Sequence, residues 1–238
     1  MAEPGAVTRA LLAIARAGAD DRALAMRICR ACVDGLGVDG AAISLLTTSA
    51  ARQTLAATDE IAELLEDLQF TLNEGACVEA ATTGRPVLVP DLRRGSEVAQ
   101  WPVFAAAVME RSPVRALFAL PLQWGAVNLG VLDLYRLTAR GLDDEQLQDA
   151  LSSAETAALM MLGLRTDPDR DGFDWLDHAV AHRAEVHQAV GMVSVQMDVS
   201  APEALARVRA HAFVHNQLLI DVARDVVARR LAFTENME

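Results

Sequence analysis

A charged, helix-breaking run from Thr166 to Gly172 constrains this chain more than any other feature of its sequence. The run reads Thr-Asp-Pro-Asp-Arg-Asp-Gly, and proline and glycine both interrupt helices. It therefore predicts a linker that divides the 238 residues into two folded parts. We expect one domain over residues 1–165 and a second over residues 173–238, joined by residues 166–172.

The first part alternates helical and strand-like patterns. Apolar residues recur at helical spacing over residues 7–36 (with a break near Gly18), 60–70, 74–84, 96–109 and 142–164. Apolar strand-like runs cover residues 41–47, 53–58, 87–89, 115–123 and 127–137. Trp124-Gly125 separates the last two runs as a hairpin turn. This order predicts an α+β fold, in which helices pack over the faces and ends of an antiparallel sheet.

The second part reads as three helices. The first runs over about 173–197 with a valine stripe, the second begins at Ser200, and the third covers about 217–231. Ser200 and Glu203 have the spacing of a capping box, in which each side chain bonds the other residue's backbone amide. The pattern predicts an all-α three-helix bundle.

Charge is distributed unevenly between the two parts. The net charge is −12, and all 21 basic residues are arginine. Residues 1–182 hold 15 Arg and 26 acidic residues, whereas residues 183–233 hold 6 Arg and 5 acidic residues. The composition argues against nucleic-acid binding over the whole surface, but the second part escapes the acidity of the first.

The cysteines and the lengths of the apolar runs indicate the cellular compartment. Three cysteines favour a reducing compartment, and no apolar run approaches the roughly 20 residues of a membrane span. With no basic, apolar leader visible, we expect a cytoplasmic protein without membrane contact. Cys29 and Cys32 lie on one face of a helix and are expected to be buried apolar residues, while Cys77 retains a possible redox role.

The sequence predicts no enzyme. All five histidines lie in the second part, so no histidine of the first part holds a haem. We find no phosphate-binding glycine loop, no nucleophile elbow and no convincing catalytic pair. We therefore expect no catalytic residues, no cofactor and no metal site.

The second part resembles the ANTAR RNA-binding module over about 50 residues. Gln188-Ala189-Val190-Gly191-Met192 is similar to the pattern of the first ANTAR helix. Arg209 and Ala212 are similar to the second helix, and residues 219–227 resemble the third. The resemblance implies a dimeric antitermination regulator that captures two adjacent hairpins of a nascent RNA and prevents terminator formation.

The first part resembles GAF sensory domains. Glu74-Gly75-Ala76-Cys77, followed by Gly84-Arg85-Pro86, is typical of GAF domains attached to ANTAR modules. The hairpin over 115–137 resembles the late GAF strands. The resemblance implies control of the RNA-binding part by a small-molecule ligand or a partner. Trp101, Phe104, Phe118 and Tyr135 are the candidate lining of a ligand cavity, with a core role the open alternative.

On the ANTAR-like part, six residues are candidate RNA contacts: Arg183, His187, Gln188, Gly191, Arg209 and Arg224. Gly191 interrupts a helix at a cost of about 1 kcal/mol, which either RNA approach or a tight helix crossing would offset. The spacings Asp221–Arg224 and Asp225–Arg229 also suit ion pairs. His211 and His215 are further candidates for stacking on bases.

Two other functions stay open at this point. The bundle-forming part could dimerise or dock a protein without binding RNA, or the first part could sense redox state through cysteine. We also expect a homodimer, formed through the helices over 7–36 and 142–164, whose rotation would align the two RNA-binding parts.

Overall fold

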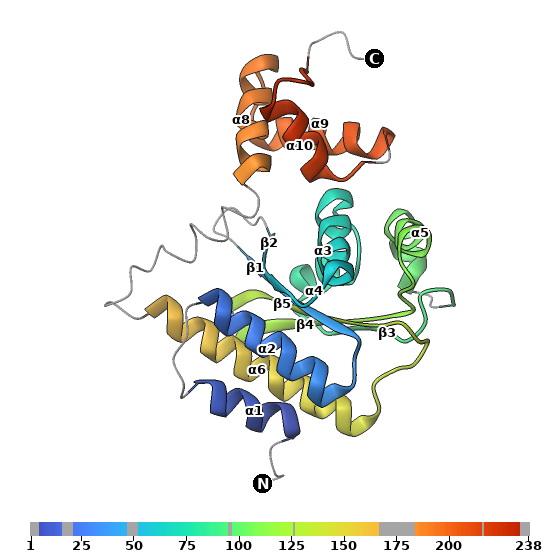
Figure 1. Ribbon diagram of the computed structural model, residues 1–238, viewed down its shortest axis with the longest axis vertical. Helices are drawn as coiled ribbons and strands as arrows, with labels where there is room; N and C mark the ends of the chain where they lie inside the picture. Colours follow the sequence, from blue (N-terminus) through green and yellow to red (C-terminus); the bar gives the residue numbers. More distant parts are fainter. Residues whose placement is uncertain are drawn as a thin grey trace.

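A five-stranded antiparallel sheet forms the centre of the first domain in a computed structural model of the chain (Figure 1). The structure describes residues 5–15, 21–46, 52–94, 97–125, 127–166, 184–215 and 217–233. The strands are β1 (Gly40–Leu46), β2 (Arg52–Ala57), β3 (Val87–Val89), β4 (Ala116–Trp124) and β5 (Val127–Arg136). Their order across the sheet is β2-β1-β5-β4-β3, which confirms the predicted antiparallel α+β arrangement.

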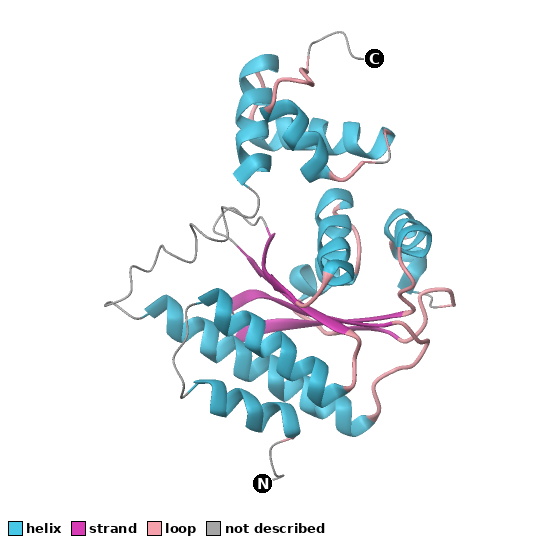
Figure 2. Ribbon diagram, viewed as in Figure 1, coloured by secondary structure: helices cyan, strands magenta, loops and turns pink. Residues whose placement is uncertain are grey.

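Helices cover both faces of this sheet (Figures 1 and 2). One face is covered by α1 (Ala6–Ala15), α2 (Asp21–Leu36) and α6 (Asp144–Thr166). The other face carries α3 (Glu60–Leu72), α4 (Ala76–Thr83), the short 3-10 helix η1 (Glu97–Gln100) and α5 (Pro102–Arg111). Asp149 of α6 accepts hydrogen bonds from the backbone amides of Val7 and Thr8, at 3.0 and 3.3 Å, and so fixes the start of α1.

Each face of the sheet has its own apolar core. Side chains alternate along β5, so that Leu132 and Leu134 pack towards α2 and α6 while Val131 and Tyr135 pack towards α3 and α4. The close pairing of β1 and β5 requires Gly130, because a Cβ there would lie 2.1 Å from the carbonyl oxygen of Ser44. The domain is therefore a helix–sheet–helix sandwich.

The helix predicted over 96–109 is in fact two elements. Trp101 has φ −129° and ψ 60°, and α5 begins at Pro102. The break follows from the proline, which lacks an amide donor and disfavours helical backbone in the preceding residue. The apolar residues keep helical spacing on both sides of Trp101, so spacing alone predicted one continuous helix.

Three helices form the described part of the second domain, in the order that the sequence predicts. They are α8 (Ala184–Met197), α9 (Ala201–Val214) and α10 (Leu219–Val227). Val186, Val193, Val208 and Val222 are buried in its core. The third helix is shorter than predicted because it ends at Val227, and Arg229 then adopts a left-handed backbone with φ 58°. Thr166, the first residue of the predicted linker, is the last residue of α6, and residues 167–172 and the start of the first predicted helix lie outside the described residues.

The bundle lies beyond the outer end of α3, on the side of the sheet opposite α1, α2 and α6 (Figure 1). The three helices at the N-terminal and C-terminal ends of the first domain pack on one another, so they are placed away from the bundle. Across the described ranges, no helix combines the length and the apolar character that crossing a membrane requires.

Candidate functional site

The Glu74-Gly75-Ala76-Cys77 motif connects three helices on the α3 side of the sheet. The Glu74 carboxylate accepts hydrogen bonds from the backbone amides of Val103 and Phe104, both at 3.1 Å, and so caps α5. Gly75 has φ 119°, and a Cβ there would lie 2.7 Å from Oε1 of Gln69. That same oxygen accepts the amide of Cys77 at 2.8 Å. The motif thus serves to join α3, α4 and α5.

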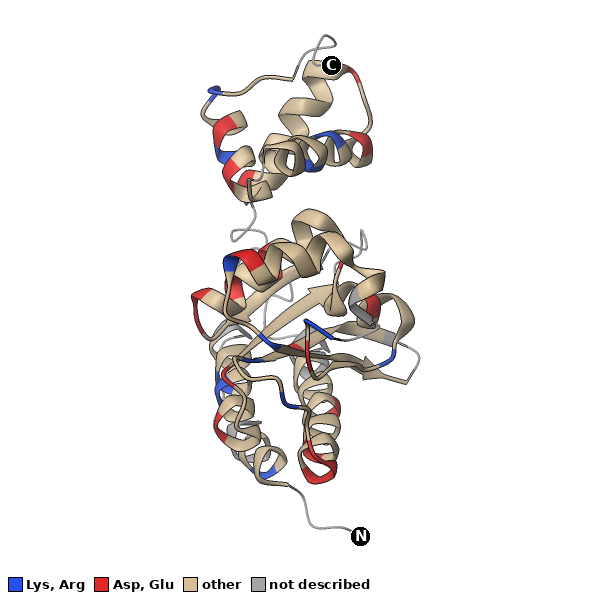
Figure 3. Cartoon of the chain, turned by 90° about the vertical axis from the view of Figure 1, so that its right-hand side faces the viewer, with Lys and Arg blue, Asp and Glu red and all other residues tan. Residues whose placement is uncertain are grey.

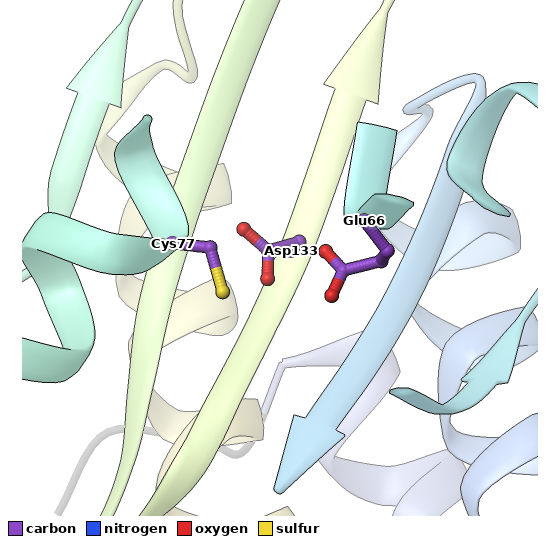
Figure 4. A group of neighbouring side chains, drawn as sticks. All are labelled: Glu66, Cys77 and Asp133. Atoms are coloured by element: carbon purple, nitrogen blue, oxygen red, sulfur yellow. The ribbon is translucent and has the colours of Figure 1, made fainter. Parts of the chain in front are cut away.

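A buried cluster of two carboxylates and a thiol lies beside this motif. Glu66 of α3, Cys77 of α4 and Asp133 of β5 have ligand atoms within 4.8 Å of one another, and Figure 4 shows Asp133 between the other two. Glu66 is 3% exposed, and its carboxylate accepts hydrogen bonds from the Ser44 hydroxyl and from the Gln69 amide, the latter at 3.3 Å. Through its bond to Ser44 of β1, Glu66 helps to hold α3 on the sheet.

Chemically, this cluster combines ligand types that a divalent cation such as Zn²⁺ accepts. Within the part of the chain that the structure describes, it is the one group of three such side chains. Three donors are one fewer than a closed structural zinc site requires. The sequence-based expectation of no metal site therefore stays a prediction.

The cavity at this cluster is small. It encloses about 10 Å³ and is lined in part by Ala62, Leu65, Gln69, Leu117 and Tyr135. That volume holds one water-sized sphere, whereas pockets for small-molecule ligands have several hundred cubic ångströms. A larger ligand therefore requires one of the cavity walls to move.

The four aromatic residues that the sequence suggested as a cavity lining do not come together. Tyr135 lines the cavity, and its hydroxyl donates to Asp59 at 2.9 Å. Burial and this hydrogen bond raise the pKa of the Tyr135 phenol. Trp101 and Phe104 form an edge-on pair in the same core cluster, with ring centroids 6.5 Å apart. Phe118 instead packs in the core on the opposite face of the sheet.

The other two cysteines are core residues, as expected. Cys29 and Cys32 are 0% exposed and pack against the α2 side of the sheet. Burial raises the pKa of the Cys32 thiol to about 12 and also raises that of Cys29. Both groups therefore stay protonated near neutral pH and are poor nucleophiles.

In the second domain, three of the six candidate RNA contacts share the exposed side of α8. His187, Gln188 and Gly191 are exposed, while Val186, Ala189 and Val193 between them are buried. A Cβ at Gly191 would meet no atom within 4 Å. The tight helix crossing that the sequence left open is therefore excluded within the described structure. Arg183 lies outside the described residues.

The remaining two candidates face the first domain. The guanidinium carbon of Arg209 lies 5.1 Å from the ring centroid of Phe70, at the end of α3. Arg224 bonds Glu185 of α8 at 3.0 Å and Asp221 at 3.5 Å, which confirms the predicted Asp221–Arg224 pair. The structure therefore divides the candidates between an exposed strip of α8 and a surface next to α3.

Sequence reasoning missed the residues that join the two domains. Phe70 is 7% exposed and belongs to the apolar core of the bundle, although it is part of α3. The Thr71 hydroxyl accepts the backbone amide of Leu219 at 3.2 Å. In return, Leu218 packs against the core between α3 and the sheet. A signal for this was present, because Phe70 lies half a helical turn away from Ile61, which packs against the core between α3 and the sheet.

Of two predicted local interactions of the bundle, one is partly correct and the other is wrong. The Ser200 hydroxyl accepts the amide of Glu203 at 3.4 Å, but the Glu203 carboxylate pairs with Arg207 at 2.9 Å instead of completing a capping box. Asp225 pairs with Arg230 at 2.7 Å and not with Arg229, because α10 has already ended and helical spacing no longer applies.

Charges of both signs are distributed over the bundle (Figure 3). Its aromatic feature is a stack of His211 on His215, with ring centroids 4.0 Å apart, and Phe233 packs edge-on against His211 at 5.4 Å. Burial lowers the pKa of His211, and the neighbouring His215 lowers it further. At neutral pH the His211 ring is therefore uncharged and offers a flat face rather than a cation.

Comparison with known proteins assigns each domain separately. Residues 18–161 match the family model of the GAF domain, and residues 175–227 match the model of the ANTAR domain. The chain resembles the GAF domain of a phosphoenolpyruvate-protein phosphotransferase from Coxiella burnetii, at 12% identity and a TM-score of 0.54, over 67% of this chain and 92% of that one. A GAF domain of the corresponding Acinetobacter protein gives 11% identity and a TM-score of 0.53, over 69% and 96%. These identities support the fold alone, and no curated protein matches the chain.

Proposed function

The chain belongs to the GAF domain family and carries an ANTAR domain after it, and we propose that it is an RNA-binding transcriptional antiterminator. Its ANTAR bundle binds paired hairpins of a nascent transcript, and its GAF domain regulates that binding. This role requires no catalytic residue and no cofactor. A homodimer presents two bundles to the two hairpins and so doubles the contacts.

The observation that carries this proposal is the exposed side of α8 within the ANTAR match. His187 and Gln188 offer hydrogen-bonding groups to solvent, and Gly191 leaves open space beside them. A glycine inside a helix costs about 1 kcal/mol relative to alanine. No helix among the described residues packs against Gly191, and close approach of an RNA backbone would offset the cost of this residue.

Electrostatics supports a modest, dimer-dependent affinity. Residues 183–233 carry 6 Arg and 5 acidic residues, and both Arg207 and Arg224 are engaged in ion pairs on the bundle surface. Phosphate contacts must therefore compete with these carboxylates. RNA recognition in such a case depends on shape and on unpaired bases more than on net charge.

A second function, docking of a protein, is favoured by exposed apolar side chains. Val195, Phe213 and Val214 of the bundle are 84%, 57% and 74% exposed. Phe213 and Val214 are adjacent at the end of α9, and exposed apolar patches mark protein interfaces. The same side chains are equally suited to the homodimer contact that the RNA role requires.

The test is a titration of the purified full chain with an RNA of two adjacent hairpins, at several salt concentrations. We expect saturable binding with a negative salt slope and loss of binding to scrambled hairpins. Gly191→Leu should weaken binding about tenfold or more, a change of about 1.4 kcal/mol. It should leave the fold intact because the added side chain meets open space.

The matched control is Ala106→Leu, the same kind of enlargement at an exposed helical position of α5. It should leave RNA affinity unchanged. Absence of binding to any paired-hairpin RNA at low salt would refute the RNA role. Retention of a dimer in that experiment would favour the protein-docking function.

A further inference from the structure

We propose that the last turn of α3 restrains the ANTAR bundle in an arrangement that does not bind RNA, and that the GAF domain signals by moving this helix. The effect on RNA rests on the function proposed above. The restraint itself rests on contacts between the two domains and stands independently of the RNA role.

The first contact is the Phe70 side chain, which is part of the bundle core. It is 7% exposed and packs in the same apolar cluster as Val208 and Ala212 of α9. The Arg209 guanidinium lies over its ring at 5.1 Å. A cation placed over an aromatic face is attracted by the ring quadrupole. Arg209, which is similar to the arginine of the second ANTAR helix, therefore lies against α3 instead of facing solvent.

The second contact completes the start of α10. The N-cap residue of α10 is Leu218, whose apolar side chain cannot accept a hydrogen bond from the first turn. The Thr71 hydroxyl of α3 accepts the Leu219 amide at 3.2 Å in a buried position. Leu218 itself packs against the GAF core. Separation of the domains would therefore expose Leu218 and leave the Leu219 amide to water.

The third feature is charge. Helix α3 contains four acidic residues and no basic residue. Two of them, Glu63 and Asp67, line an interdomain cleft of about 230 Å³ together with Asp221 and Arg224. A phosphate that approached Arg224 through this cleft would meet three carboxylates. In this arrangement, α3 covers Arg209 and places carboxylates, which repel a phosphate, beside Arg224.

A different side of helix α3 forms a wall of the small cavity beside Glu66 and Asp133. Ala62, Leu65, Glu66 and Gln69 line the cavity, whereas Phe70 and the outer acidic side chains contact the bundle or its cleft. Because the cavity encloses only about 10 Å³, a ligand larger than water must displace a wall. Displacement of α3 would break both contacts with the bundle and so couple the two sites.

The experiment compares full-length wild type with Phe70→Ala and Thr71→Val. For each we would measure affinity for paired-hairpin RNA, and by amide hydrogen exchange the protection of Leu219. Thr71→Val removes the hydroxyl and keeps the side-chain shape. Thr82→Val is the matched control, because the Thr82 hydroxyl bonds only the carbonyl of Val78 within α4, at 2.7 Å.

We expect roughly tenfold tighter RNA binding by Phe70→Ala, a smaller gain by Thr71→Val, and faster Leu219 exchange in both. Thr82→Val should match wild type. Circular dichroism shows whether Phe70→Ala still folds. If its bundle is unfolded, the result for Thr71→Val alone tests the proposal. Unchanged or weaker RNA binding by a folded variant with faster exchange would overturn the inhibitory role and leave the RNA function standing. If no variant binds RNA, the proposed function fails, and Leu219 exchange still decides whether α3 restrains the bundle.

Discussion

The GAF and ANTAR domains differ in how each completes its core. The GAF domain has an apolar cluster on each side of a five-stranded sheet, built almost wholly from its own side chains. Among the described residues, the helices of the ANTAR bundle have 14, 14 and 9 residues, and the bundle core includes Phe70 from α3. A domain of this size buries little apolar surface by itself. The bundle therefore depends on the GAF domain more than the GAF domain depends on the bundle.

The largest effect should come from the GAF core, through Phe118→Ala. Phe118 is 1% exposed, and loss of a buried phenylalanine side chain costs about 3–5 kcal/mol. Because α3 is part of this domain, the bundle should lose protection at the same denaturant concentration. Chemical denaturation followed by segment-resolved hydrogen exchange measures both. Trp124→Ala on the same strand, at a side chain 51% exposed, should change stability by about 0.5 kcal/mol or less.

A core substitution in the bundle should remain local. Val193 is 0% exposed, so Val193→Ala should lower the free energy of unfolding of the bundle by about 2 kcal/mol. We expect early exchange in α8, α9 and α10, with protection of the sheet unchanged. The control on the same helix is Val195→Ala, at a position 84% exposed. Loss of sheet protection in Val193→Ala would contradict the one-way dependence of the domains.

Enlargement of a cavity wall should transmit a smaller effect across the interface. Ala62→Met fills a cavity that encloses about 10 Å³ and so presses α3 outward, at a cost of about 1 kcal/mol. The expected result is faster exchange of the Leu219 amide, while β4 and β5 stay protected. Ala106→Met at an exposed position of α5 should have no effect. Equal exchange of the Leu219 amide in Ala62→Met and Ala106→Met would show that the cavity does not affect the bundle.

The smallest expected effect is a pH dependence of the bundle alone. Burial, followed by the nearby His215, lowers the pKa of His211 below its ordinary value of 6.5. The unfolded chain therefore binds a proton more readily than the folded bundle, so stability is retained above that pH and decreases as the pH falls below it. Denaturation at about pH 7.5 and about pH 5.5 should show the loss. His211→Asn should reduce the difference, and an unchanged midpoint in wild type would argue against it.

Much of the fold could be predicted from the sequence because apolar periodicity is a local property. The strand Val87–Val89 and the hairpin at Trp124-Gly125 were placed correctly, since proline and glycine limit them directly. The break at Pro102 was missed, because the apolar spacing continues on both sides of it. The end of α10 was missed for a similar reason, as Arg229 and Arg230 are residues that favour helices.

Residues of the candidate site could be predicted only where the apolar spacing of a single helix determines which side chains are exposed. The valine stripe of α8 placed Gln188 and Gly191 on the opposite side and His187 on its flank, and all three are exposed in the structure. The position of Arg209 depends on Phe70, which is distant in sequence and belongs to the other domain. Likewise, the cavity and the Glu66–Cys77–Asp133 cluster are assembled from three separate elements. Spacing along one helix carries no information about such contacts.

The exchange of Phe70 and Leu218 between the domains has a consequence for how this architecture can diversify. An ANTAR bundle moved by gene fusion to another sensor would leave behind the aromatic residue that fills its core and the hydroxyl that caps α10. Successful fusions would need a sensor that already supplies an equivalent helix end, or compensating changes at positions 209 and 218. We therefore expect the last turn of α3 and the first turn of α10 to be inherited together, as one unit that crosses the boundary between the two domains.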